Sequence, residues 1–278
     1  MDRTHTPFPP SKKAAAPQNG TQLRSFHGIS PKSRLARVLA VILALLVWQV
    51  AAMLLGNGIL LASPLQAARR LMTLLTEPTF WQSLLFSTLR IMGGFLLGLA
   101  TGVLLAGLAA RFPWVETLLM PFVLCIKSVP VASFVILCLI WLSAVKLPIF
   151  ISFLMVFPVI YTNVLNGIQA TDPKMLEMAW AFRLSFGRKM KYIYLPAVKP
   201  FLLSACSIAL GLAWKAGIAA EVIGIPDGSI GEKLYMAKIY FETAELFAWT
   251  AVIVLISRCL EKLFLRLLRF VIRKWEEA

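Results

Sequence analysis

Few side chains in this 278-residue chain could carry out acid–base, redox or metal chemistry. Both histidines, His5 and His27, lie in a polar amino-terminal stretch, away from the apolar body of the chain. The sequence contains no paired carboxylates on one helical face, no Ser–His–Asp set and no phosphate-binding GxxxxGK[ST] loop. The cysteines form no CxxC pair and have no histidine nearby: Cys125, Cys138, Cys206 and Cys259. We therefore predict no catalytic site, no metal site and no cofactor bound by this chain.

The ionisable residues inside apolar runs are the remaining candidates for function. Lys127 precedes Ser128 in one run, and Lys215 follows Trp214 in another, with Glu221 six residues later. A charge in hydrocarbon is costly unless it faces protein or water, so these five residues are candidates to line a path across a membrane. The two lysines would suit a small anion. The alternative, that they reach the headgroups or form ion pairs between helices, remains open.

The composition predicts an all-α, polytopic membrane protein. Hydrophobic residues make up 59% of the chain and charged residues 15%, which argues against a soluble enzyme. The net charge of +15 is spread between apolar stretches instead of forming one patch, which argues against nucleic-acid binding. Six stretches are long enough to span a bilayer as helices: 38–55, 82–110, 118–142, 147–168, 201–220 and 246–264.

The domain organisation and orientation follow from the polar segments. Residues 1–34 are rich in proline and polar residues and are predicted to be a disordered tail, and residues 35–278 to be the transmembrane domain. Ser63 and Pro64 have the types expected at the start of a short interfacial helix. With a cytoplasmic amino terminus, 20 basic residues fall on the cytoplasmic side and five on the other. Both termini, the tail and the loop at about 170–199 are therefore predicted to be cytoplasmic.

Two membrane-segment patterns bear on packing. Small residues recur every four positions at Gly94, Gly98, Gly102, Ala106 and Ala110, which lets another helix approach closely. Packing inside one subunit is favoured over a contact between subunits. The glycine-rich loop at 224–231 could form an outer gate or a plain surface turn.

The loop at about 170–199 is the most informative polar segment. Asp172 and Pro173 indicate the start of a helix. Its predicted apolar face consists of Met175, Met178, Ala179 and Phe182. An amphipathic helix outside the membrane needs a partner. One reading is that it lies on lipid headgroups, attracted through the basic residues that follow, Arg188, Lys189 and Lys191.

This loop resembles the coupling loop of permease subunits of bacterial ATP-binding cassette (ABC) importers. Glu177, Met178 and Ala179 stand where that family has Glu-Ala-Ala, and Ile193, Leu195 and Pro196 fall at the required spacing in its Ile-x-Leu-Pro motif. The family's turn glycine is replaced by Arg183, and Gly187 could supply a turn instead. Further stretches, including 83–102, 127–142 and 221–231, are similar to the nitrate, sulfonate and taurine branch.

The resemblance implies both partners and residue roles. It implies a second permease copy, two cytoplasmic ATP-binding subunits that hold ATP and Mg, and an extracellular or periplasmic substrate-binding protein, at the bacterial cytoplasmic membrane. Glu177 would cap or pair locally, and Pro196 would fix the exit into the fifth span. Met178, Ala179 and Phe182 would form the buried anchor in the ATPase. Alternatives are an importer of a pyrimidine-type vitamin precursor, a secondary transporter and a membrane-embedded enzyme.

Overall fold

The structure, a computed structural model, describes residues 31–56, 58 and 60–277, without the side chains of residues 31–34, 37, 276 and 277. The chain divides into two units, residues 1–46 and 47–278. The predicted disordered tail falls largely outside the described residues, and α1 (Pro31–Leu55) begins at Pro31. All regular elements of the described residues are helical, in agreement with the predicted all-α class.

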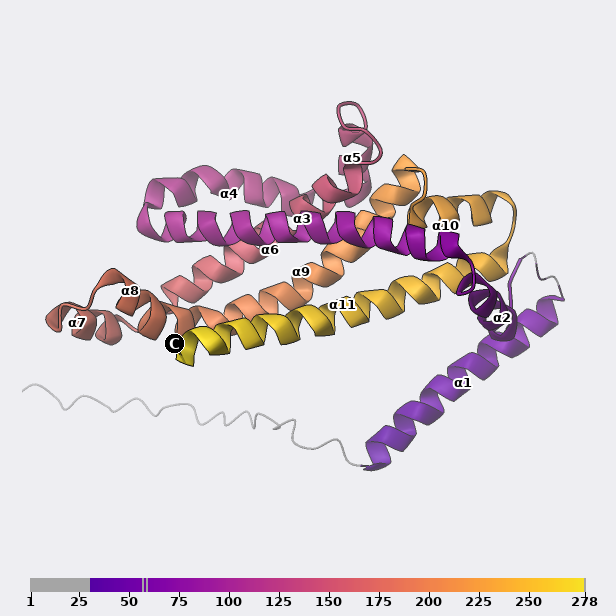
Figure 1. Cartoon of the computed structure of the whole chain (residues 1–278), viewed down its shortest axis with the longest axis horizontal. Coiled ribbons are helices and arrows are strands. Elements are labelled where there is room, and N and C mark those ends of the chain that lie inside the picture. Colours follow the sequence, from indigo (N-terminus) through magenta and orange to yellow (C-terminus); the bar gives the residue numbers. More distant parts are fainter. Residues whose placement is uncertain (1–30, 57, 59, 278) are drawn as a thin grey trace, which may run out of the picture. The chain divides into compact units, whose positions relative to one another are not determined.

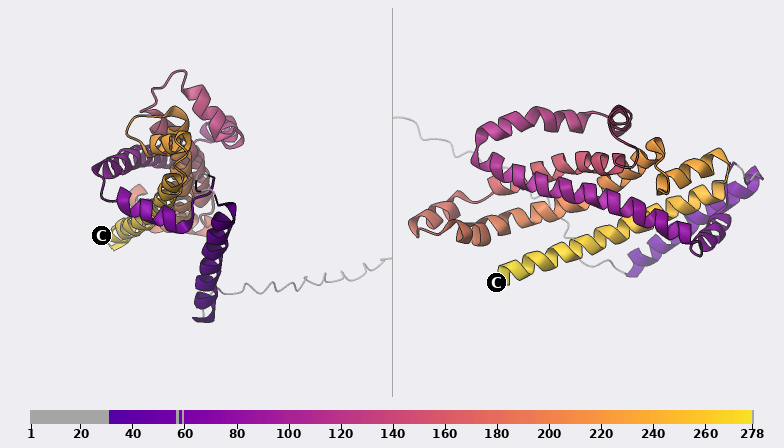
Figure 2. Two further views of the ribbon diagram at one scale, coloured as in Figure 1. Left: turned by 90° about the vertical axis from the view of Figure 1, so that its right-hand side faces the viewer. Right: turned by 45° about the horizontal axis from the view of Figure 1, so that its top comes forward.

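The second unit is built from helices of very different lengths (Figure 1). Four long helices, α3 (Pro78–Arg111), α6 (Leu147–Gln169), α9 (Leu195–Gly224) and α11 (Thr243–Glu277), run lengthwise and pack on one another (Figure 2). The shorter elements join them: α2 (Pro64–Leu74), α4 (Pro113–Ser128), α5 (Val131–Cys138), α7 (Pro173–Ala181), α8 (Phe186–Lys189), the single π-helical segment η1 (Met190–Tyr194) and α10 (Ile230–Ile239).

Four helical stretches are long and apolar enough to cross a membrane. They are Val38–Leu55 in α1, α3, α6, and the continuous stretch Phe186–Gly224 that contains α8, η1 and α9. The predicted span at 118–142 is broken, because α4 and α5 meet at an angle of 104° at Val129 and Pro130. Counted together, this bent pair gives up to five spans among the described residues. The stretch predicted at 246–264 lies within α11, which is not one of these candidates.

Local capping explains where α2 begins. The Ser63 hydroxyl accepts a hydrogen bond from the backbone N–H of Gln66, and the Gln66 side chain accepts one from the N–H of Ser63. Pro64 occupies the first helical turn, where its missing N–H costs nothing. The predicted start of this helix at Ser63 and Pro64 is therefore confirmed.

The small-residue stripe of α3 packs against α6 of the same chain. A Cβ added to Gly94 would lie 2.2 Å from the carbonyl oxygen of Ile149, and one on Gly98 would lie 2.8 Å from Cβ of Val156. Gly102 meets Ile160 in the same way. Packing inside one subunit, the interpretation favoured from the sequence, is thus confirmed. The last predicted member of the stripe is wrong, however: Ala110 is exposed, and its neighbour Ala109 is buried instead.

Helix α9 closes on this pair at another point of close approach. A Cβ on Gly217 would lie 2.5 Å from Cγ1 of Ile91 on α3 and 2.8 Å from Oγ of Ser152 on α6. The Ser152 hydroxyl donates a hydrogen bond of 3.1 Å to the carbonyl of Ala213. The three long helices therefore meet at Gly217, where α9 has no room for a side chain.

Enlarging a glycine at this contact should destabilise the fold. We expect Gly98→Leu to lower the free energy of unfolding by about 1–3 kcal/mol, because the new side chain has to displace Val156. Thermal unfolding of the purified protein in detergent measures the effect.

Gly107→Leu is the matched control on the same helix, because a Cβ there meets no atom within 4 Å. Equal melting temperatures for the two variants would contradict the proposed importance of the α3–α6 approach.

Candidate functional site

The loop between α6 and α9 begins with a capped helix. The Asp172 side chain accepts a hydrogen bond of 2.9 Å from the backbone N–H of Lys174, and Pro173 occupies the first turn of α7. This N-terminal cap agrees with the helix start predicted from the sequence. Figure 1 shows α7 and α8 together at one end of the second unit, near the carboxyl terminus of α11.

The end of α7 uses a backbone conformation that favours glycine. Arg183 has a φ of 45°, in the left-handed region. Its N–H donates to the Trp180 carbonyl at 3.0 Å, and the N–H of Leu184 donates to the Ala179 carbonyl at 2.9 Å. These two bonds form a Schellman motif that satisfies the last carbonyls of the helix. The suggestion that Gly187 makes this turn is wrong, because Gly187 lies in α8 and its φ is not positive.

The apolar side chains of α7 point in two directions. Met178 and Phe182 are 45% and 75% exposed, whereas Ala179 is completely buried in its own chain. Ala179 therefore packs against the rest of its own chain and is not available as an anchor for a partner, which corrects the expectation from the sequence. The outward surface, which we call the α7 apolar face, consists of Met175, Met178 and Phe182.

The other residues of the motif divide between the surface and the fold. Glu177 is exposed and makes no hydrogen bond or ion pair with another described residue, so its predicted local cap or pair is wrong; Asp172 is the cap. Ile193 is 7% exposed within η1. Leu195 is the first residue of α9, and Pro196 lies in its first turn, the position predicted for the exit from the loop.

Lys127 and Ser128 lie at the last turn of α4, just before the bend into α5. Lys127 is exposed, and its Nζ donates a 2.9 Å hydrogen bond to Oγ1 of Thr162 on α6. The Ser128 hydroxyl bonds the Leu124 carbonyl within its own helix. The lysine is thus oriented by a neutral hydroxyl and not by a carboxylate.

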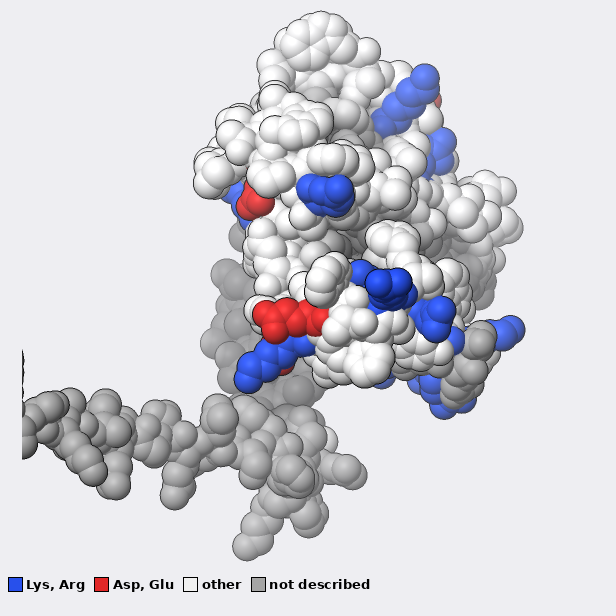
Figure 3. Space-filling model, turned by 90° about the vertical axis from the view of Figure 1, so that its left-hand side faces the viewer, with Lys and Arg blue, Asp and Glu red and all other residues white. Residues whose placement is uncertain are grey.

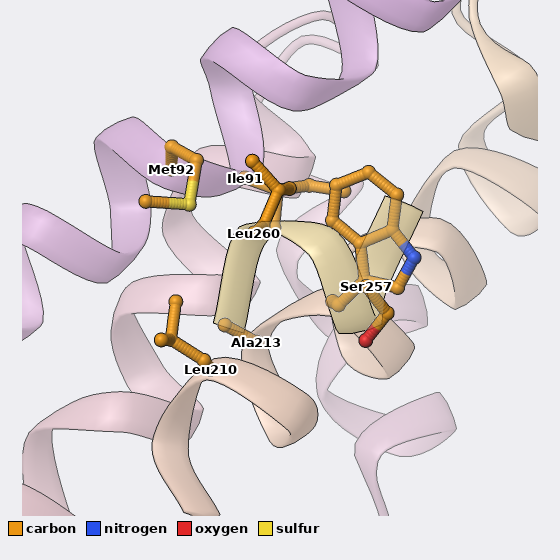
Figure 4. A pocket seen from close by; sticks show the side chains of 7 residues that line it. Ile91, Met92, Leu210, Ala213, Ser257 and Leu260 are labelled. Atoms are coloured by element: carbon orange, nitrogen blue, oxygen red, sulfur yellow. The ribbon is translucent and has the colours of Figure 1, made fainter. Parts of the chain in front are cut away.

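Lys215 and Trp214 are neighbours on α9 that face opposite environments. Lys215 is exposed, while Trp214 is 2% exposed and donates from Nε1 to the Ile253 carbonyl on α11 at 3.0 Å. Trp214 therefore belongs to the core, and its assignment to a translocation path is wrong. A small cavity of about 10 Å³ lies beside Trp214 and has room for at most one water (Figure 4). The cavity is lined by Ile91, Met92, Leu210, Ala213, Trp214, Ser257 and Leu260.

Glu221 is also buried, with 0% exposure, and its carboxylate clamps the start of α10. Its Oε2 accepts hydrogen bonds from Oγ of Ser87 on α3 at 2.7 Å and from the N–H of Gly231 at 3.2 Å. Ser87 in turn accepts from the N–H of Ile230 at 3.0 Å. The burial of Glu221 and these hydrogen bonds correct the expectation that it lines a path, although its Oε1 is buried without a hydrogen-bond partner among the described residues. A Cβ on Gly231 would lie 2.3 Å from Cβ of Glu221, so glycine is required there.

Ser87 was not identified from the sequence, although a serine in an apolar helix is a signal that a buried polar partner exists.

Arg70 is a second residue whose role was not identified from the sequence. It bonds Glu245 at 2.7 Å and Glu77 at 3.2 Å, and so joins α2 to α11. Burial alone would lower the pKa of Arg70, but the hydrogen bond and charge of Glu245, with the charges of Glu77 and Glu242, raise it. The guanidinium therefore stays charged. Arg70, Glu242 and Glu245 border an open cavity of about 420 Å³.

Comparison with known proteins agrees with this arrangement. Residues 94–276 match the family described as "binding-protein-dependent transport system inner membrane component". The chain belongs to this family. The matched part contains α3 from Gly94 onward, α6, the α7 loop and α9, so the α7 loop lies within the family's own domain.

The curated relatives are transport permeases. The chain is 28% identical over 245 residues to a Bacillus subtilis protein named for aliphatic sulfonates transport, covering 86% of each chain. It is 28% identical to the taurine transport system permease protein of Escherichia coli, covering 82% of this chain and 84% of the relative. It is 29% identical to the nitrate import permease protein of Synechococcus elongatus, covering 67% and 70%. The chain is thus an ABC importer permease of the sulfonate, taurine and nitrate branch.

A solved structure supports the fold alone. A chain from a crystal structure of an amino acid ABC transporter with histidines superposes with a TM-score of 0.54 at 18% identity, covering 71% of this chain and 94% of that chain. Together, the family and the apolar helices make this a multi-pass membrane protein and a transporter component, not an enzyme in its own right.

Replacing Arg183 by glycine should stabilise the α7 loop. Glycine adopts the left-handed conformation without a Cβ penalty, so we expect a local gain of about 0.5–1 kcal/mol. Hydrogen exchange at the Leu184 amide, which closes the Schellman motif, should slow by about two- to fivefold.

Arg188→Gly serves as the comparison, because Arg188 lies in α8 and has no positive φ. If Arg188→Gly slowed exchange at Leu184 as much as Arg183→Gly, relief of left-handed strain would not be the cause.

Proposed function

We propose that this chain is the transmembrane permease subunit of an ATP-driven importer for a small anion of the sulfonate, taurine or nitrate type, delivered by a substrate-binding protein. The observation that carries the proposal is the α7 apolar face. A rigid helix, capped at both ends and inside the family-matched region, holds Met178 and Phe182 away from its own fold. Exposed apolar side chains on a fixed helix indicate a protein partner.

The proposed topology has six crossing segments: α1, α3, the α4–α5 pair, α6, α9 and α11. Helix α11 has 35 residues, about 52 Å at helical rise, which exceeds a hydrocarbon core of about 30 Å. The asymmetry of basic residues favours cytoplasmic termini and a cytoplasmic α7 loop at the bacterial cytoplasmic membrane. Figure 3, which faces the end of the second unit with α7 and α8, shows many more Lys and Arg side chains than acidic ones.

The coupling mechanism follows from what this chain lacks. Its sequence has no phosphate-binding loop, so ATP and Mg belong to separate cytoplasmic ATP-binding subunits, and work reaches this chain by contact. The α7 apolar face docks in the ATPase, with Glu177 and Arg183 at its exposed edge. Ala179 and Ile193 are buried within this chain, and η1 contacts α9, so that a movement of the docked α7 loop is passed through η1 to α9.

The translocation path is proposed to form between this chain and a second copy of it. Lys127 and Lys215 are exposed on α4 and α9, whereas Trp214 and Glu221 are buried in the core. Positive side chains on an exposed membrane-segment surface favour an anionic solute. An importer of a pyrimidine-type vitamin precursor is the alternative. A secondary transporter has less support, because the relatives are ABC permeases.

Disrupting the α7 apolar face should release the ATPase. We expect Met178→Glu and Phe182→Glu each to reduce co-purification of the ATP-binding subunit with the tagged permease at least about tenfold, because a carboxylate would be buried in an apolar contact. Pull-down from native cells followed by mass spectrometry measures the ratio and also identifies the substrate-binding protein.

Tyr240→Glu is the control, an equally exposed aromatic residue at the end of α10. Ala179→Asp is unsuitable as a docking test, because it would disturb the loop itself. Undiminished recovery of the ATPase with both α7 variants would refute docking through this face.

Removing the positive charge of Lys215 should impair transport of an anion. We expect Lys215→Ala to lower uptake of labelled taurine, an alkanesulfonate or nitrate about tenfold, and Lys215→Arg to preserve most of it, because the charge is retained.

Lys238→Ala, on α10, removes an exposed lysine without touching the membrane segments. Uptake that is unchanged in Lys215→Ala, together with normal ATPase retention, would remove Lys215 from the path and favour an uncharged substrate.

A further inference from the structure

The second half of α11 carries basic side chains along one face. Arg258, Lys262, Arg266, Arg269 and Arg273 follow one another at intervals of three or four residues, so they fall within about 80° of the helix circumference. All five are exposed. We call this set the basic stripe.

Three members of the basic stripe, Lys262, Arg266 and Arg269, are not neutralised by carboxylates of the described residues. Within the described residues 258–275, the acidic side chain is Glu261, which is 21% exposed. It accepts hydrogen bonds from Oγ of Ser207 at 2.5 Å and from Nη1 of Arg258 at 3.1 Å. Lys262, Arg266 and Arg269 make no ion pair with another described residue. Their charges are thus available to an external anion.

The rest of the helix surface shows how the basic stripe is presented. Phe264 packs edge-to-face on Phe95 of α3 at 4.9 Å, and Ile272 is 5% exposed, so this half of α11 is fixed to the fold. Leu263, Leu267 and Phe270 are 57–60% exposed and lie beside the basic stripe. The helix therefore presents an apolar strip and a positive strip side by side, on a backbone that is already ordered.

We propose that the basic stripe binds anionic phospholipid headgroups of the inner leaflet. An apolar strip next to long basic side chains matches acyl chains next to phosphates, which arginine and lysine reach by extending along the membrane surface. The assignment to the inner leaflet rests on the proposed topology. Because α11 also contacts η1, the bound lipid lies close to the segment that joins the α7 loop to α9.

The test uses the full chain in nanodiscs of equal phosphatidylglycerol and phosphatidylcholine, followed by native mass spectrometry of the lipids retained. We expect enrichment of phosphatidylglycerol on the wild type that weakens in 0.5 M salt. Lys262→Gln, Arg266→Gln and Arg269→Gln together should reduce that enrichment at least about tenfold, since each basic residue near the surface contributes about fivefold.

The control removes the same number of charges from exposed positions outside α11 and the α7 loop: Arg69→Gln, Lys146→Gln and Lys238→Gln together should leave enrichment within about twofold. An equal loss in this control, or no enrichment on the wild type, overturns the proposal. The proposal is also overturned if the triple variant of the basic stripe retains phosphatidylglycerol but no longer co-purifies with the ATP-binding subunit, because the basic stripe would then contact a protein. Nanodiscs expose both leaflets, so the result does not depend on which end of the chain is cytoplasmic, and ATPase docking through α7 is scored separately.

Discussion

The close approach of α3 and α6 is the constraint on which the other contacts depend. At Gly94, Gly98 and Gly102 the space for a side chain is taken by atoms of α6, so the two helices touch almost backbone to backbone. Lipid is as apolar as leucine, so membrane helices associate through tight packing and hydrogen bonds rather than hydrophobic burial. Helix α9 then fits against both at Gly217, and α11 joins through the Trp214 hydrogen bond.

Local signals predicted where the two short helices α2 and α7 begin. Ser63 and Asp172 are capping residues whose hydrogen bonds reach only two or three residues ahead, so their effect is visible in a short window of sequence. The glycine stripe was equally readable, because its spacing matches the helical repeat. The 104° bend between α4 and α5 was harder: Pro130 marks a break, but the angle is set by what α5 packs against.

The sequence was less informative about which way a functional side chain faces. Ala179 and Met178 are neighbours on a predicted apolar face, yet one is buried and the other exposed, because the loop has its own chain on one side. Glu221 and Trp214 looked like candidates for a pathway because they are polar or aromatic in apolar segments. Their partners, Ser87 and the Ile253 carbonyl, lie 134 and 39 residues away, and only the tertiary structure brings them together.

The length of the continuous helical stretch Phe186–Gly224 has a mechanical consequence. Its 39 residues measure about 58 Å at helical rise, and it carries the exit of the α7 loop at one end and the Glu221 clamp near the other. Because the helix is so long, tilting it by about 5° at the loop end moves its far end by about 5 Å. The helix can bend at the π-helical turn Met190–Tyr194, near the loop end, because the regular hydrogen-bond pattern is interrupted there.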